Sequence, residues 1–140
     1  MQRITIAEVE EIAFYLARKM FSFNEPIPDF STRFPNILES CLETPFQTFG
    51  KKELYPTFIA KVGMLFYLMN KNHPFQNGNK RVAMTTLFYV LHKQNQWLKV
   101  DIQQLYNFGV WVAESPPDAK EEVVKYIQKF VRTYMVPLDE

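Results

Sequence analysis

One short stretch of the chain, NHPFQNGNKRVA at residues 72–83, carries an unusual share of its chemically useful side chains. His73 is the side chain best suited near neutral pH to take a proton from an attacking hydroxyl group. Gly78 lets the backbone approach a ligand without a Cβ atom in the way, and Lys80 and Arg81 add positive charge beside it. A base and an anion-binding segment in one loop indicate phosphoryl or nucleotidyl transfer.

This loop is expected to join two buried helices. Residues 57–70 and 80–92 are apolar around most of their circumference, which is typical of helices enclosed by other helices. The first turn of the second helix would offer backbone N–H groups and the positive end of the helix dipole to a phosphate. Phe75 lies two residues after His73 and is expected to turn inward, where it would anchor the loop on the core.

The remaining segments predict further helices. A Thr5–Glu8 capping box precedes a helix over residues 6–20, and a short helix is expected from Pro35 to Glu43. Residues 22–32, with two prolines, are expected to form a loop. Helices are also expected over residues 101–114 and from Asp118 onward. In the last helix an apolar stripe is formed by Val123, Val124, Ile127, Phe130, Val131, Tyr134 and Met135.

One segment does not follow a helical period. Residues 46–56, FQTFGKKELYP, place a Gly-Lys-Lys turn between aromatic residues, which indicates a small β-like ribbon or flap. The sequence therefore predicts an all-α fold of about six helices with one small ribbon. Residues 1–140 show no internal repeat and no linker, so they are expected to form a single domain.

Composition and charge exclude several classes of function. The formal net charge of +1 gives no support for a general polyanion-binding surface, and Lys71, Lys80 and Arg81 form only a small basic cluster, so nucleic acid is not an expected partner. No apolar run reaches the length of a membrane span. The lone Cys41 and the absence of a signal-peptide pattern favour a cytoplasmic location. Cys41, His73 and His92 have no spacing typical of zinc ligands.

Residues 73–81, HPFQNGNKR, resemble the signature of the Fic/Doc superfamily, and their Asn-Lys-Arg ending is most similar to the Doc (death-on-curing) branch. The resemblance implies a compact helical Fic/Doc-type domain. It makes His73 the general base that deprotonates a hydroxyl group of a target protein, and Phe75 the structural anchor. It also implies that Gly78, Asn79 and Lys80 contribute to the site for the nucleotide phosphates, where catalytic Arg81 neutralises terminal phosphate charge.

Two positions depart from the pattern of AMP-transferring Fic enzymes. Lys80 stands where those enzymes carry a second glycine, and in the Doc branch this lysine accompanies a reversed nucleotide pose and transfer of the γ-phosphate. Asn77 stands where Fic enzymes carry an acidic residue that helps to hold Mg²⁺. A neutral amide is a poorer ligand for this hard cation than a carboxylate, so weaker magnesium binding is expected at Asn77.

The resemblance therefore implies a Doc-like toxin that uses ATP and Mg²⁺ to phosphorylate a Ser or Thr hydroxyl of a cytoplasmic protein, with elongation factor Tu as the first target to test. No Ser/Thr-x-x-x-Glu-Gly/Asn inhibitory string occurs in the chain, so control is expected from a Phd-like antitoxin in trans. Two alternatives are AMP transfer to a protein hydroxyl and a catalytically impaired Fic-fold module that binds other proteins.

The basic turn of the ribbon has two interpretations. Gly50, Lys51 and Lys52 are either a simple solvated turn or, as in the family, part of a flap that receives an extended target segment by strand addition and places its hydroxyl near His73. A two-residue basic turn does not distinguish them. Trp97 and Trp111 are expected to pack in the core or at its edge rather than to bind a ligand.

Overall fold

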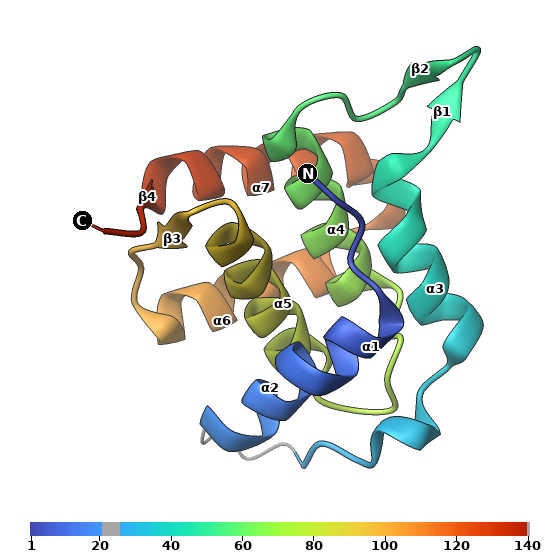
Figure 1. Ribbon diagram of the computed structural model, residues 1–140, viewed down its shortest axis with the longest axis vertical. Helices are drawn as coiled ribbons and strands as arrows, with labels where there is room; N and C mark the ends of the chain where they lie inside the picture. The colour runs from blue at the N-terminus through green and yellow to red at the C-terminus, as the bar shows by residue number, and fades with distance from the viewer. Residues whose placement is uncertain (21–25, 140) are drawn as a thin grey trace.

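The structure is a computed structural model that describes residues 1–20 and 26–139. Within these residues it contains six helices and two short ribbons, which confirms the predicted all-α fold (Figure 1). The first helix is continuous through α1 (Ile6–Glu8), a π-helical segment (Val9–Phe14) and α2 (Tyr15–Met20). The other five are α3 (Pro35–Glu43), α4 (Phe58–Lys71), α5 (Asn79–Lys93), α6 (Ile102–Glu114) and α7 (Lys120–Tyr134).

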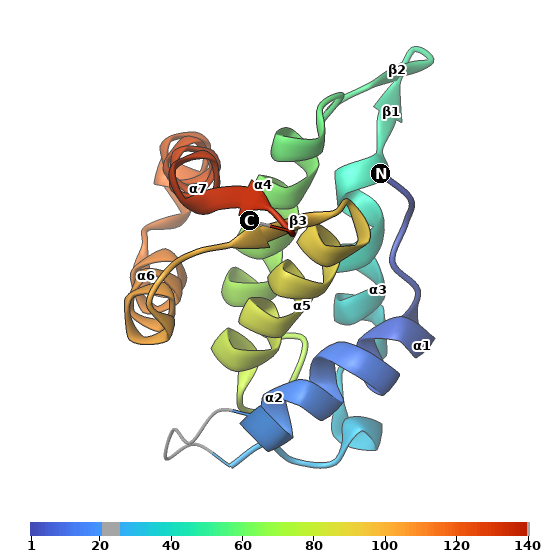
Figure 2. The ribbon, with the colours of Figure 1, turned by 60° about the vertical axis from the view of Figure 1, so that its left-hand side comes forward.

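Helices α4 and α5 form the centre of the molecule. Helices α6 and α7 pack on one side of this central pair, and α3 and the first helix lie on the other side (Figure 2). Every residue of α4 from Lys61 to Asn70 is buried, as its sequence predicted. In the part of the chain that the structure describes, no helix is both long and apolar enough to cross a membrane.

The first helix begins where it was predicted but is not a regular α-helix throughout. The Thr5 hydroxyl oxygen accepts the Glu8 backbone N–H at 3.1 Å, and a Glu8 carboxylate oxygen accepts the Thr5 backbone N–H at 3.1 Å, so the capping box is formed. The backbone then widens into a π-helix over Val9–Phe14. In this segment the Ala13 carbonyl oxygen accepts a hydrogen bond from the Thr85 hydroxyl of α5 at 2.6 Å. A partner of this kind is a common feature of irregular helical turns.

The predicted ribbon is present as a two-stranded antiparallel hairpin. Strands β1 (Thr48–Phe49) and β2 (Lys52–Glu53) are joined by Gly50 and Lys51, with φ values of 56° and 67°. Positive φ at both turn residues matches the right-handed twist of the strands. The hairpin extends from the helical body near the N-terminal end of α4 (Figures 1 and 2).

A second ribbon was not predicted. Strand β3 (Gln96–Leu98) pairs in antiparallel fashion with β4 (Met135–Pro137). Met135 therefore belongs to this strand and does not continue the apolar stripe of α7, which ends at Tyr134. Three-residue strands are too short for period-two alternation to be recognised in a sequence.

Two other boundaries differ from the prediction. The last helix begins at Lys120, because Pro117–Ala119 form a separate 3₁₀ turn after Ser115. Residues 30–32 also form a 3₁₀ turn within the predicted 22–32 loop, and residues 21–25 lie outside the described part of the chain. The Asp101 carboxylate caps α6 by accepting the Gln104 backbone N–H at 3.1 Å, as expected from the sequence.

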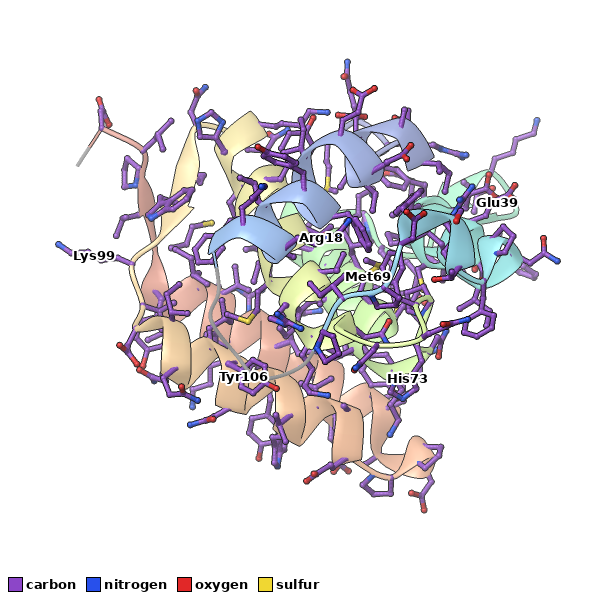
Figure 3. The ribbon with its side chains drawn as sticks, turned by 90° about the horizontal axis from the view of Figure 1, so that it is seen from below. Arg18, Glu39, Met69, His73, Lys99 and Tyr106 are labelled. Atoms are coloured by element: carbon purple, nitrogen blue, oxygen red, sulfur yellow. The ribbon has the colours of Figure 1, made fainter. Side chains whose placement is uncertain are left out.

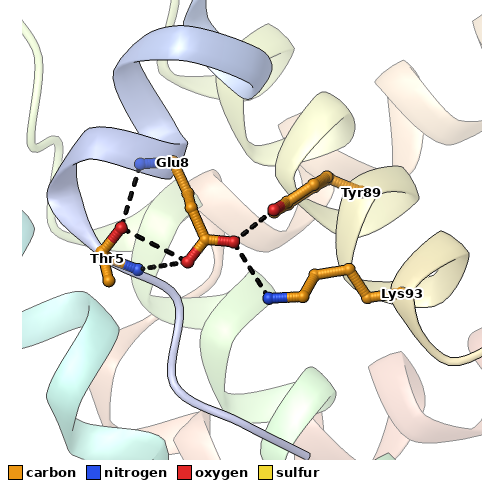
Figure 4. Close-up of polar contacts among 4 residues, drawn as sticks. All are labelled: Thr5, Glu8, Tyr89 and Lys93. Atoms are coloured by element: carbon orange, nitrogen blue, oxygen red, sulfur yellow. Dashed lines mark hydrogen bonds and ion pairs between the residues drawn. The ribbon is translucent and has the colours of Figure 1, made fainter.

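The start of the first helix is joined to the end of α5 by a polar cluster around Glu8 (Figure 4). One carboxylate oxygen of Glu8 accepts hydrogen bonds from the Tyr89 hydroxyl and from the Lys93 ammonium, the latter at 2.9 Å. Burial by itself raises the pKa of Glu8, but the bonds from Tyr89, Lys93 and the Thr5 backbone outweigh it and lower the pKa from 4.5 to about 2. Burial and the bond to Glu8 raise the pKa of Tyr89 to about 12.

Replacing this carboxylate should make the protein less stable in a pH-dependent way. Because the folded-state pKa of Glu8 is depressed, its stabilisation is complete above pH 4.5 and is lost as the pH falls towards 2. We expect Glu8→Gln to lower the free energy of unfolding at pH 7 by about 1 kcal/mol, allowing for the partial exposure of the pair, and to have little effect near pH 2. Urea unfolding at several pH values measures this difference. The exposed Glu39 of α3 provides a control in Glu39→Gln, and a pH-independent loss in Glu8→Gln would contradict the assignment.

Candidate active site

The loop with the predicted chemistry joins the C-terminal end of α4 to the N-terminal end of α5 (Figure 1). The Asn72 backbone N–H closes α4 by donating to the Leu68 carbonyl at 2.9 Å, and His73 follows with a positive φ of 51°. Histidine is one of the residues that adopts this left-handed conformation more readily than most. The His73 side chain is exposed, and Figure 3 shows it at the end of the molecule where this loop lies. The proposed base is thus accessible from solvent.

Phe75 fixes this loop to the core. Its side chain is 2 % exposed, and its ring centroid lies 5.4 Å from that of Phe14 and 5.9 Å from that of Phe30. One residue earlier, the Pro74 carbonyl accepts the Phe34 backbone N–H at 2.9 Å. The structure therefore places Phe75 in the anchoring position expected from the sequence.

Asn79 closes the loop on itself. Its side-chain oxygen accepts the Phe75 backbone N–H at 2.9 Å, and its side-chain nitrogen donates to the Phe75 carbonyl at 2.9 Å. The Asn79 side chain is buried, so both ends of its amide serve the loop. Because both ends of the side-chain amide are bonded to Phe75, only the backbone N–H of Asn79, in the first turn of α5, can contribute to a phosphate site.

Gly78 is required for a reason that the sequence did not reveal. It precedes α5 with a φ of 77°, and a Cβ atom at this position would lie 2.6 Å from Cγ1 of Ile27. The Ile27 side chain thus fills the space next to Gly78. From the sequence we expected that space to allow a ligand to approach the backbone. Both the left-handed backbone and the contact with Ile27 favour glycine here.

Positive charge gathers at the first turn of α5, but its two members differ in exposure. Lys80 is half-buried, and its Cβ atom faces α6, 3.9 Å from where a Cβ on Gly109 would lie. Arg81 is 4 % exposed, so its side chain is buried. Both charges reinforce the positive end of the α5 dipole.

The structure offers little to hold a divalent cation by protein atoms alone. The Asn77 side-chain oxygen accepts the Gly78 backbone N–H at 2.9 Å. Among the described residues no three His, Cys, Asp or Glu side chains come together, and Cys41 is buried, which raises its thiol pKa to about 12. Magnesium is commonly bound through one or two protein ligands together with substrate phosphates, and Asn77 fits only that mode.

The ribbon does not lie beside His73, which corrects the flap interpretation of Gly50, Lys51 and Lys52. The ribbon precedes α4 and the loop follows it, and a helix of this length separates its ends by about 21 Å. Figures 1 and 2 both show the ribbon and the loop at opposite ends of α4. The buried Lys61 holds the ribbon there, with its ammonium 3.0 Å from the Glu53 carboxylate and bonded to the Tyr55 carbonyl.

A different segment borders the loop. Ile27 contacts Gly78, Phe30 packs on Phe75, and the Phe34 backbone bonds to Pro74. Tyr106 of α6 is also on the face of the molecule shown in Figure 3. These neighbours could not be predicted from the sequence, because each contact joins residues that are far apart along the chain.

Lys71, two residues before His73, has a structural role. Its ammonium donates to the Ala113 carbonyl at 3.1 Å and to the Ser115 carbonyl, at the C-terminal end of α6. A cation is favoured at this end of a helix, where carbonyl groups lack helical partners. Lys71 therefore stabilises the junction of α4 with α6 and is not available to extend the basic cluster of Lys80 and Arg81.

Of the comparisons with known proteins, the one with family models gives a match. The family model described as "Fic/DOC family" matches residues 3–91, which include the first helix, the loop and most of α5. No curated protein and no solved structure matches the chain. Helices α6 and α7 lie outside the matched range.

Alanine substitutions at Gly78 and Gly50 should separate two contributions to the loss of stability, backbone strain at positive φ and steric contact with a neighbouring side chain. Gly78→Ala meets both an unfavourable φ and the Ile27 side chain, so we expect it to lower the free energy of unfolding by about 3 kcal/mol. Gly50→Ala has a similar φ but open space around it, so we expect a loss of about 1 kcal/mol. Chemical denaturation measures both losses, and equal effects would show that the contact with Ile27 is unimportant.

Proposed function

Because the chain belongs to the Fic/DOC family, whose members are transferases that act on nucleotides and protein hydroxyls, we propose that it transfers the γ-phosphate of ATP to a Ser or Thr hydroxyl of a cytoplasmic protein. One observation carries this proposal: the exposed His73 lies in the same short loop as the N-terminal end of α5, with Lys80 in its first turn. The arrangement combines a base with an anion-binding helix end.

His73 would act on the hydroxyl of the target. As the hydroxyl oxygen attacks the γ-phosphorus of ATP, its proton passes to a His73 ring nitrogen, the bond to the β-phosphate oxygen breaks, and ADP leaves. The positive φ of His73 and the buried ring of Phe75 hold the imidazole at the mouth of the loop. The protein would therefore contribute orientation as well as the base.

The start of α5 would bind the transferred phosphate. Gly78 has no side chain to cap the helix, so a ligand can approach the first-turn N–H groups that a capping side chain would otherwise occupy. Lys80 and Arg81 add two positive charges in the first turn of the same helix. These features favour the phosphate end of ATP over an uncharged ligand.

Lys80 favours phosphate transfer over AMP transfer. Its side chain is half-buried between the start of α5 and α6, where a glycine would leave open space. A charged side chain at this point reduces the room for a pyrophosphate leaving group. AMP transfer to a protein hydroxyl is the alternative enzymatic reaction.

Magnesium would bind together with ATP. The side-chain oxygen of Asn77 is the protein atom that we propose as its ligand. When bound, the ion would neutralise phosphate charge. The Asn77 oxygen already accepts the Gly78 N–H, although an amide oxygen has a second lone pair. This weak donor set supports a second candidate function, a Fic-fold module that binds other proteins and has lost most of its catalytic rate.

In the cell we propose a toxin role. Phosphorylation of an essential cytoplasmic protein would arrest growth, and elongation factor Tu is the first target to test. Control would come from a Phd-like antitoxin in trans that covers the loop around His73. Co-expression of the neighbouring upstream reading frame should then relieve growth arrest.

Removing the base should abolish transfer. We expect His73→Ala and His73→Asn to lower the transfer rate at least 100-fold, since general bases contribute on the order of 10² to 10⁴. Asparagine tolerates the left-handed backbone at this position, so His73→Asn tests the loss of the base without added strain. Intact-mass analysis of elongation factor Tu after incubation with ATP and Mg²⁺ measures the product.

The second histidine provides a matched control. His92 is exposed at the last turn of α5, so His92→Ala should keep the wild-type rate. An added AMP in place of an added phosphate would overturn the kinase proposal. Full activity of His73→Asn would exclude His73 as the base.

A carboxylate at position 77 should distinguish a working site from an impaired one. We expect Asn77→Asp to lower the Mg²⁺ concentration needed for half-maximal transfer, because a carboxylate binds this cation better than an amide. Titration of Mg²⁺ at fixed ATP measures the change. If the wild type is inert with every nucleotide while Asn77→Asp is active, the impaired-module interpretation is correct and the wild-type kinase proposal fails.

A further inference from the structure

An open groove is lined by side chains of α6 and α7, two helices that run next to each other (Figure 2). Its volume is about 400 Å³, within the range of binding pockets. We call it the aromatic groove; it is lined by Phe108, Trp111, Tyr126, Lys129, Phe130, Thr133 and Tyr134. Lys129 and Thr133 are the main polar groups of this lining, so the groove is suited to apolar side chains.

The rings of the groove are packed against one another. Phe108 stacks on Phe66 of α4 at 6.2 Å and on Phe130 of α7 at 4.3 Å between centroids. Trp111 stacks on Phe108 at 5.6 Å, yet 45 % of Trp111 and 55 % of Tyr126 are exposed. Phe108 lies within this stack, so the exposed apolar surface of the groove comes mainly from Trp111 and Tyr126. Apolar side chains of a partner would bury this surface.

The α7 side of the groove is basic. From residue 123 to residue 134 the helix carries Lys125, Lys129 and Arg132 and no acidic residue, whereas the whole chain has a net charge of only +1. None of these three side chains forms an ion pair within the described residues. Glu121 and Glu122 directly precede this basic stretch on α7, and Glu122 lies beside Lys125, Tyr126 and Lys129. The charge pattern is complementary to an acidic partner.

We propose that the aromatic groove binds an acidic amphipathic helix of a partner protein. Its apolar side chains would enter between α6 and α7, and its carboxylates would face Lys125, Lys129 and Arg132. A helix is favoured over an extended strand because the walls are two helices, which offer no free strand edge, and an i, i+3, i+4, i+7 pattern fits such a groove. This site is independent of the transfer reaction proposed for His73.

A pair of synthetic peptides tests the proposal. One is a tryptophan-free helix of about 18 residues with leucine at the apolar positions and glutamate beside them, and the other replaces each glutamate with lysine. Trp111 emission in full-length Trp97→Phe protein reports binding. We expect the acidic peptide to bind at least tenfold more tightly than the basic one, with an affinity that falls as salt is raised.

Charge variants locate the contact. We expect Lys129→Glu to weaken binding of the acidic peptide at least fivefold, while Lys19→Glu, which makes the same charge change on α2, alters it less than twofold. Both lysines are exposed, so neither variant should disturb folding, and circular dichroism verifies this.

Four outcomes would overturn the proposal. They are equal binding of the two peptides, no response of Trp111, tighter binding of a single-stranded oligonucleotide, and self-association of the protein that Lys129→Glu abolishes. The last result would show that a second copy of this chain occupies the groove, and sedimentation velocity detects it.

Discussion

Two hydrogen bonds between the Asn79 side chain and the backbone of Phe75 determine the shape of the candidate active site. They join two residues four positions apart and so close the second half of the loop between α4 and α5. Without them the Phe75 N–H and carbonyl would be buried without partners, which costs about 1–3 kcal/mol for each group. The position of the Phe75 ring, and with it that of His73, depends on this closure.

The rest of the molecule supports the closed loop from three sides. Phe14 of the first helix and Phe30 pack on the Phe75 ring, and Ile27 fills the space beside Gly78. Lys71 joins the end of α4 to the end of α6. His73 is exposed, whereas Pro74, Phe75 and Gly78 of the same loop are buried, so a solvent-accessible base rests on buried, well-packed neighbours.

Local features of the fold could be predicted from the sequence, because they depend on residues close together in the chain. Thr57 caps α4 and Gly78 precedes α5, and both helices begin and end within a residue or two of the prediction. The β3–β4 pairing escaped prediction because it joins two three-residue strands nearly forty residues apart. At the candidate site, residue types indicated the chemistry of His73 and Lys80, but not that Ile27 lies against Gly78. The distance of the ribbon from His73 could have been inferred, since a whole helix separates them.

The π-helical segment of the first helix affects the direction of the side chains on either side of it. One residue of an α-helix turns the chain by about 100°, so a wide turn shifts the angular phase between the residues before it and those after it. Glu8, before the segment, meets Tyr89 and Lys93, while Phe14, at its end, meets Phe30 and Phe75. The first helix therefore makes contacts at both ends of α5. Glu8 bonds to residues near the C-terminal end of α5, and Phe14 packs on Phe75 in the loop before its N-terminal end. The π-helical segment sets the angle between these two side chains. Removing one residue between positions 9 and 14 would restore a regular helix but would rotate one of these two contacts away from its partner.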